Sequence, residues 1–375
     1  MKLPTLLICL LGTSVSAPGT ESPAVKPVDA ISQAGIQSAF QILRKEYIRK
    51  DDLTFDELNR SALQGLLSRL NFGAELEANV PPAPSPPGGL HSELLLSDIA
   101  YLRLDSYSES EVTQVELTLK QFADQSVRSL ILDLRAPVPP GSFDVAAGLL
   151  DLFLPRGIVL FKMKQLGQQN AELVLSRTDA VWTSPLIVLI DEETGSVGEA
   201  IAGVLSQQKR ALLVGMPTRG ATVRYDRVPV DEKWSLRFAR EEMLLPDDSS
   251  LFMKGLQPDF RVSLPAETKH TLFKISRGGS IKPHVFDETR PRYNEAALVA
   301  RKHPELDAYI RRSAGELTDE GTQPARDLVL QRAVDMLLAS HFLTEEKLKW
   351  PKAAPAKTKP TADASPPRAE PIKDQ

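Results

Sequence analysis

Short apolar runs alternate with amphipathic stretches through the middle of the chain. The apolar runs have the length and the residue types of strands, and they lie at 99–104, 129–134, 158–162, 173–176, 186–190 and 211–215. Between them, apolar residues recur at helical spacing in 111–123, 143–152 and 197–205. Strands that alternate with helices predict an α/β fold with a mostly parallel sheet, and we place this core at residues 97–265.

Helical patterns flank this core on both sides. Residues 28–72 contain two amphipathic stretches, and the second opens at Thr54 with the sequence of a capping box. Residues 266–345 form a C-terminal helical region whose expected packing face consists of Leu328, Leu330, Ala333, Met336 and Leu337. Inside the core, 223–228, 234–239 and 243–246 predict an additional β-meander.

Two segments are biased in composition. Residues 73–96 include a proline-rich run at 81–87, which predicts a linker. Residues 346–375 are rich in alanine, proline and lysine and have no apolar periodicity, which predicts a disordered tail.

The N-terminus has the pattern of an export signal. Lys2 supplies a positive charge, 6–11 are apolar, and 15–17 are small, so we expect cleavage after residue 17. The apolar stretch is far shorter than the roughly 20 residues that span a bilayer, so we expect no membrane span. The expected destination is the periplasm or the extracellular space. Cys9, the single cysteine, lies inside this signal, so the processed chain would contain no disulfide.

Charge and histidine content argue against several classes of function. Hydrophobic residues make up 42% and charged residues 25%, which is ordinary for a soluble globular protein. The net charge is −4 and the basic residues are dispersed, so nucleic acid is not an expected partner. No metal-ligand spacing links the five histidines, His91, His270, His284, His303 and His341. We therefore expect no metal and no cofactor.

The order of the short motifs resembles that of the tail-specific (C-terminal-processing) serine protease family. The matching segments are IAYLRL at 99–104, LILDLR at 130–135, LFLP at 152–155, PLIVLI at 185–190, EAIAGVL at 199–205, RALLVG at 210–215 with Thr218, and GLQPD at 255–259. This resemblance implies a crotonase-like core preceded by a helical pair. It also implies a serine at a helix N-terminus as nucleophile, a lysine as general base, and backbone N–H groups that hold the oxyanion.

The sequence departs from the family pattern at each of these chemical positions. Aligned through 199–203, the nucleophile position falls on Gly198, which has no side chain, and the lysine position falls on Ala221 or Gly220. Ser196 precedes Gly198 in a capping-box sequence, so we expect its side chain to cap the helix; a displaced nucleophile is the alternative.

The turn after the 129–134 strand and the neighbouring arginines differ as well. The family's glycine-rich oxyanion turn is replaced by a sequence in which Gly141 survives but Pro139 and Pro140 lack N–H donors. Arginine is a permanently charged side chain, so Arg219 and Arg224 cannot act as a base. They are either solvated residues or ligands for an anion such as a peptide carboxylate. The interval 72–97 is also too short for the PDZ domain that the family usually carries.

Taken together, these residues predict an exported pseudopeptidase that binds peptide or protein segments in a remnant cleft. The cleft is expected to be formed by Gly141, Ser196, Gly198, Glu199, Thr218, Arg219 and Arg224. One alternative is a serine-type peptidase with a rebuilt site. Another is a carrier of small apolar ligands, because the fold resembles the repeats of the interphotoreceptor retinoid-binding protein. The sequence leaves the oligomeric state open.

Overall fold

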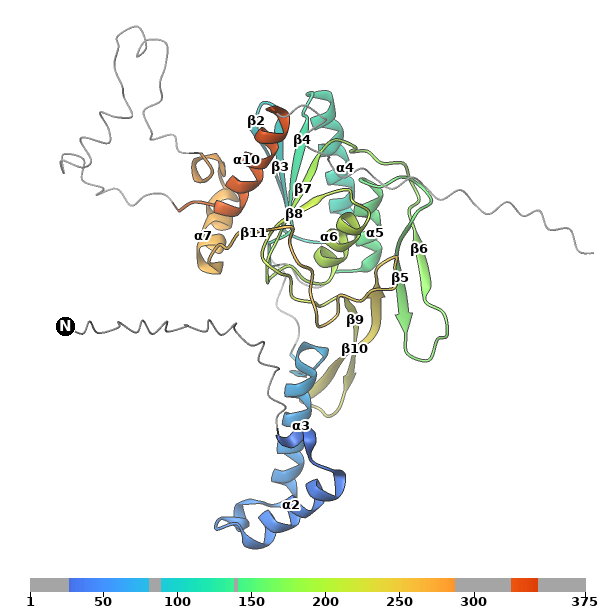
Figure 1. Cartoon of the computed structure of the whole chain (residues 1–375), viewed down its shortest axis with the longest axis vertical. Coiled ribbons are helices and arrows are strands. Elements are labelled where there is room, and N and C mark those ends of the chain that lie inside the picture. The colour runs from blue at the N-terminus through green and yellow to red at the C-terminus, as the bar shows by residue number, and fades with distance from the viewer. Residues whose placement is uncertain (1–26, 81–88, 138–140, 287–324, 343–375) are drawn as a thin grey trace, which may run out of the picture. The chain divides into compact units, whose positions relative to one another are not determined.

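The computed structural model describes residues 27–80, 89–137, 141–286 and 325–342 (Figure 1). The predicted signal at 1–17, the predicted tail at 346–375 and residues 287–324 of the predicted C-terminal helical region lie outside these residues. The chain divides into two compact units, with the boundary between Leu70 and Asn71, close to the predicted end of the N-terminal helical region at residue 72. No helix within the described ranges is long and apolar enough to cross a membrane.

The first unit consists of helices α1 (Pro27–Ala30), α2 (Gln33–Glu46) and α3 (Phe55–Leu70), with a 3-10 turn η1 (Lys50–Asp52) between α2 and α3. Ser32 caps α2 by accepting a hydrogen bond from the Gly35 amide at 3.1 Å. Thr54 Oγ1 accepts from the Glu57 amide at 3.2 Å, as the capping sequence predicts. Arg69 in the last turn of α3 pairs with Asp29. The predicted helical pair is therefore confirmed.

The second unit is built on a largely parallel sheet with the order β11-β8-β7-β4-β3-β2. Every neighbouring pair is parallel except β2 and β3. The strands are β2 (Leu90–Leu96), β3 (Ile99–Leu104), β4 (Ser129–Asp133), β7 (Leu186–Ile190), β8 (Leu212–Gly215) and β11 (Phe260–Arg261). All residues of β3, β4 and β7 are buried, as expected when both faces of a parallel sheet are covered. The predicted α/β class is confirmed.

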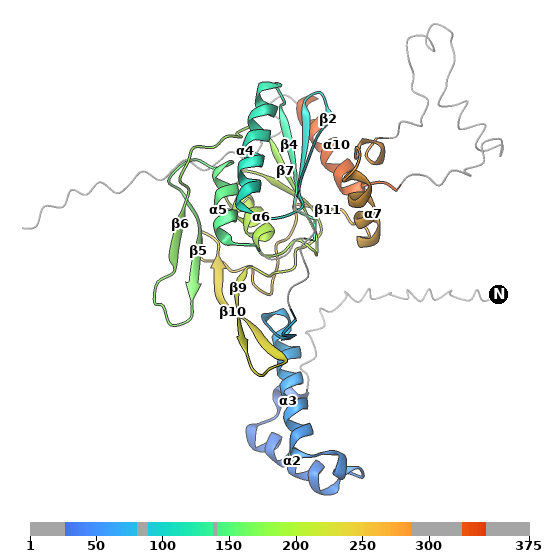
Figure 2. The ribbon, with the colours of Figure 1, turned by 180° about the vertical axis from the view of Figure 1, so that it is seen from behind.

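Helices cover both faces of this sheet (Figures 1 and 2). One face packs on α4 (Glu109–Asp124), α5 (Phe143–Asp151) and α6 (Val197–Gln207). The other face packs on α7 (Ala266–Ser276), the turn η3 (Lys282–His284) and α10 (Leu328–Phe342). Leu330, Ala333 and Leu337 of α10 are buried as predicted, whereas Leu328 is half exposed because it begins the helix at its outer end.

A second sheet is organised around the long strand β10 (Trp234–Leu244). One edge of β10 pairs with β9 (Val223–Pro229), and the other pairs first with β1 (Ala74–Ala78) and then with β5 (Val159–Gln165), which continues to β6 (Glu172–Leu175). The predicted three-stranded meander is thus a hairpin. The polar residues 240–242 interrupt the apolar pattern, but they lie within β10. The ladder contains a bulge between Ala239 and Glu241, so the strand continues past the interruption.

The linker predicted at 73–96 is wrong at both ends. Residues 74–78 form β1, whose side chains Glu75 and Glu77 pair with Arg237 of β10. Residues 90–96 form β2, the antiparallel edge of the main sheet. Strand residues flank the proline-rich run on both sides. The linker was predicted from the composition of residues 73–96 as a whole, and this average does not reveal the two strands.

Candidate functional site

The N-terminus of α6 is reached through a strained turn at Ser196. This residue has φ 49° and ψ −114°, a backbone conformation that costs an L-residue about 1–3 kcal/mol. Its side chain makes no capping hydrogen bond, which corrects the prediction that Ser196 caps the helix through its hydroxyl. These dihedrals differ from the extended ones that a capping residue usually adopts. Ser196 is nonetheless buried, with 9% of its surface exposed.

Glu199, in the first turn of α6, fastens the helix to the loop at 218–221. Its carboxylate accepts hydrogen bonds from the Thr218 hydroxyl, from the Gly220 amide at 2.5 Å and from the Ala221 amide at 2.6 Å. Burial raises the pKa of this carboxyl, although the Thr218 hydroxyl and these amides oppose the rise. A fully buried acid therefore fixes both the helix start and the loop that follows β8.

The loop at 218–221 places Ala221 beside the turn that precedes α6. The Ala221 Cβ lies 3.8 Å from the position that a Cβ on Gly195 would occupy. Ala221 is buried, so this position brings a methyl group, and no amine, next to the turn. Lys269, a buried lysine of α7, is engaged with the Arg135 carbonyl at 2.9 Å and with Asp191 and Glu193. Its ammonium is therefore committed to other partners.

A tyrosine that the sequence does not single out packs against two of the predicted site residues. A Cβ added to Gly141 would lie 2.9 Å from the Tyr107 Cβ, and one added to Gly198 would lie 2.7 Å from the Tyr107 hydroxyl. Tyr107 thus occupies the space that side chains at both glycines would need. Burial raises the pKa of its phenol, with Asp133 and Glu111 adding to the rise, so the hydroxyl stays protonated. In the sequence, only the two distant glycines, Gly141 and Gly198, could have indicated that a large side chain packs here.

The two predicted arginines have different surroundings. The Cβ and Cδ atoms of Arg219 both lie 3.9 Å from the Cβ position of Gly195, and its guanidinium lies over the Phe72 ring at 5.6 Å. Arg224 instead pairs with Glu241 on β10 at 2.7 Å. The described contacts of Arg224 do not reach the Glu199 cluster, so Arg224 is not part of the site at the helix start.

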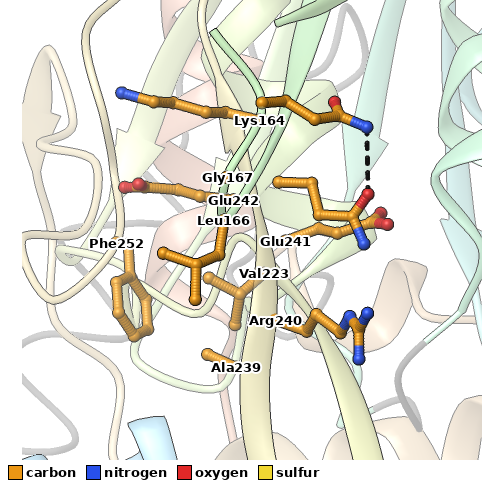
Figure 3. A pocket seen from close by; sticks show the side chains of 11 residues that line it. Lys164, Leu166, Gly167, Val223, Ala239, Arg240, Glu241, Glu242 and Phe252 are labelled. Atoms are coloured by element: carbon orange, nitrogen blue, oxygen red, sulfur yellow. Dashed lines mark hydrogen bonds between the residues drawn. The ribbon is translucent and has the colours of Figure 1, made fainter.

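Two cavities formed by described residues lie beside the β10 sheet, and each is lined by both charged and apolar residues. One, of about 360 Å³, is bounded by 164–168, by 239–242 of β10, and by Val223 and Phe252 (Figure 3). At its rim the Gln168 side-chain amide donates to Gln165 Oε1 at 3.0 Å. The other, of about 290 Å³, is lined by Phe143, Asp144, Arg224 and Glu241 among others. Neither cavity includes Ser196 or Ala221.

The DLR segment that ends β4 has a structural role. Arg135 binds Asp133 of the same segment and Asp327 at the start of α10, each at 2.7 Å through Nη2. Tyr101 donates to the Asp133 carboxylate at 2.8 Å. Burial opposes the ionisation of Asp133, but the charge and hydrogen bonds of Arg135 outweigh this effect and hold the pKa of Asp133 below the ordinary value.

Within the described part of the chain, no cluster of three or more potential ligands could hold a metal.

Comparisons with known proteins converge on one family. Residues 98–262 match the profile of peptidase family S41. The chain is 26% identical over 235 residues to the carboxy-terminal-processing protease of Bartonella bacilliformis, covering 61% of this chain and 54% of that one. It is 21% identical over 268 residues to the carboxy-terminal processing protease CtpA of Bacillus subtilis, covering 69% and 54%. The chain spans about half the length of these curated relatives.

Among solved structures, the photosystem II D1 C-terminal processing protease aligns with a TM-score of 0.41 and 22% identity. That alignment covers 57% of this chain and 54% of the other.

Proposed function

The α/β core of this chain belongs to peptidase family S41, and we propose that it holds peptide or protein segments without cutting them. The observation that carries the proposal is the buried methyl group of Ala221 beside the turn at Ser196, a position where the family resemblance implies a lysine. A serine hydroxyl is a weak nucleophile at neutral pH and needs an adjacent base. Among the described residues, the Ser196 side chain forms no hydrogen bond to a lysine, a histidine or a carboxylate.

Ser196, in place of Gly198, is our candidate for the nucleophile position. A nucleophile of this type needs a hydroxyl at the positive end of a helix, and Ser196 is the residue directly before α6. Gly198 lies inside the helix, and a serine there would point its Cβ at the Tyr107 hydroxyl. The site would then have kept its hydroxyl and lost its base.

The oxyanion turn supports loss of hydrolysis independently. Pro139 and Pro140, which lie outside the described residues, have no N–H, whereas the family resemblance implies N–H donors at these positions. The scaffold around the site is intact by contrast, because Glu199 still holds the loop at 218–221 against the helix. A preserved scaffold with altered chemistry favours retention of binding over retention of cleavage.

We also propose that the protein acts outside the cytoplasm. The support is the export pattern at residues 1–17, with its charged, apolar and small-residue parts in order. Peptide or protein segments in the periplasm or the extracellular space would then be the ligands.

Rebuilding the base tests the loss of hydrolysis. We expect wild type and Ser196→Ala to leave an unstructured protein such as β-casein uncut and to resist a fluorophosphonate probe. We expect Ala221→Lys to cut casein measurably, Ala221→Met to stay inactive, and the added Ser196→Ala change to abolish the gain. Cleavage by wild type that disappears in Ser196→Ala would overturn the proposal. Binding is followed separately by anisotropy with a labelled peptide, and its absence would reject the binding half.

A further inference from the structure

The cavity of about 290 Å³ lies between the N-terminus of α5 and the strands β5, β6, β9 and β10 of the second sheet. Its base is apolar. Phe143 of α5 and Phe161 and Met163 of β5 are at most 8% exposed, and Val174 of β6 is partly buried. The ring centroids of Phe143 and Phe161 lie 6.1 Å apart, with the rings tilted by 57°. The base therefore offers an aromatic and aliphatic surface to a ligand.

The strand register places acidic side chains on the same face as this apolar base. Alternate residues of a strand share a face, so Met163 and Gln165 of β5 point to the same side. Glu172 of β6 pairs with Met163, and Glu241 of β10 pairs with Gln165. Figure 3 shows Glu241 and Glu242 extending to opposite sides of β10. The carboxylates of Glu172 and Glu241 therefore border this cavity, whereas Glu242 borders the other one.

The charges around the cavity do not balance. Arg224 is the one cation among the lining residues, and it is paired with Glu241 at 2.7 Å. The Asp144 carboxylate accepts a hydrogen bond from the Ser142 hydroxyl at 2.8 Å and pairs with no cation of the described residues. Within the same residues, the Glu172 carboxylate forms no hydrogen bond and no ion pair. Two carboxylates on opposite sides of an apolar base are thus left without a positive partner.

We propose that this cavity accepts a lysine or arginine side chain of a bound peptide. Such a side chain has an apolar stem and a charged head, which match the two parts of the cavity. The stem packs on Phe161 and Met163, and the head donates charge-assisted hydrogen bonds to Asp144 and Glu172. An apolar side chain would leave both carboxylates unpartnered, and an acidic one would be repelled by them.

The cavity shares two stretches of chain with the candidate site. Phe143 follows Gly141 by two residues, and Gly141 packs on Tyr107 beside Gly198. Arg224 follows Ala221 by three residues, in the segment that Glu199 holds against α6. The assignment rests on the proposed peptide binding, and it adds which kind of peptide side chain is recognised and where.

The test compares three peptides that differ at one side chain. Gly-Ser-Ala-Xaa-Ala-Ser-Gly, with an uncharged BODIPY label at the N-terminus and an amide at the C-terminus, is prepared with lysine, norleucine or glutamate as Xaa. Binding to the purified full chain is followed by anisotropy. We expect the lysine peptide to bind about threefold to tenfold tighter than the norleucine peptide, which keeps the stem and lacks the charge. The glutamate peptide should bind most weakly, and about 0.5 M NaCl should reduce the lysine preference.

Variants of the two unpaired carboxylates assign the preference to the cavity. Asp144→Asn and Glu172→Gln should each reduce the preference for lysine over norleucine, and the double variant should remove it. Both side chains are exposed, so these variants should unfold at the wild-type Tm. Glu109→Gln is the matched control, because Glu109 is an exposed acid in the first turn of α4, as Asp144 is in α5. It should leave the preference intact.

The outcomes separate this inference from the proposed function. Equal affinity for the lysine and norleucine peptides overturns recognition of a basic side chain while peptide binding stands. No binding of any of the three peptides rejects the proposed function itself. A lysine preference that persists in the double variant reports general attraction of cations to a chain of net charge −4, and it overturns the assignment to this cavity. An equal loss of the preference in Glu109→Gln overturns it as well.

Discussion

Replacing Glu199 by glutamine perturbs the connection between α6 and the loop at 218–221 with little change in volume. The carboxylate accepts three hydrogen bonds from buried donors, and each bond to a charged acceptor contributes about 1.5–3 kcal/mol. A glutamine has one oxygen and one NH₂ group, so its NH₂ group faces at least one donor and leaves it unpaired. Relief of the buried charge offsets part of this loss, because burial raises the pKa of Glu199. We expect a net destabilisation of about 2–4 kcal/mol.

The assay is thermal unfolding followed by circular dichroism near pH 7.5. At about 2–4 °C per kcal/mol for a domain of this size, Glu199→Gln should lower the Tm by about 5–15 °C. Glu192→Gln is the control, since Glu192 is exposed and only seven positions away, and it should shift the Tm by less than about 2 °C. Amide hydrogen exchange at Gly220 and Ala221 should accelerate in the Glu199 variant. A Tm equal to that of the control, with unchanged exchange, would refute the role given to Glu199.

Three further changes test other parts of the structure. Asp133→Asn should cost about 3–5 kcal/mol at pH 7. The pKa of Asp133 in the folded protein lies below the ordinary 3.8, so the stabilisation by its carboxylate is present above pH 3.8 and is lost as the pH falls through the folded-state pKa. The urea midpoints of wild type and Asp133→Asn should therefore converge in acid. Gly198→Ala should cost about 1–3 kcal/mol through its contact with Tyr107; a Tyr107→Phe background that recovers none of this loss in a double-mutant cycle would contradict the contact. Lys269→Met should cost about 3 kcal/mol by leaving the partly buried carboxylate of Asp191 without its cation, and it fails as a prediction if chemical denaturation finds no loss.

Periodicity and turn chemistry predict the regular part of the fold. Strand β3, helix α5 and helix α6 are found where the sequence places them, because each has a clean apolar pattern bounded by turns. Strand β1 was missed because its five residues include two glutamates that pair with Arg237 on a distant strand. Long-range pairing of this kind leaves no local signal.

The site is harder to read from the sequence than the fold. The structure brings residues 196–199 and 218–221 into contact through Glu199. The predicted side-chain cap at Ser196 is absent, since backbone dihedrals are set by the surrounding turn. Tyr107 could not be found either. Its side chain occupies the space that a Cβ at Gly141 or Gly198 would need. Such a steric requirement for glycine can be recognised only when the neighbouring residues in the structure are known.

Helix α10 has a consequence for how the protein can be divided. It inserts buried apolar side chains into the sheet face opposite α6, and Asp327 ties its start to Arg135 through two hydrogen bonds at 3.1 and 2.7 Å. A fragment cut at residue 265 would expose that face and leave Arg135 short of one carboxylate. A chain cleaved between residues 286 and 325 should instead stay assembled as two pieces, and a synthetic peptide of residues 325–342 should complement a fragment that lacks it.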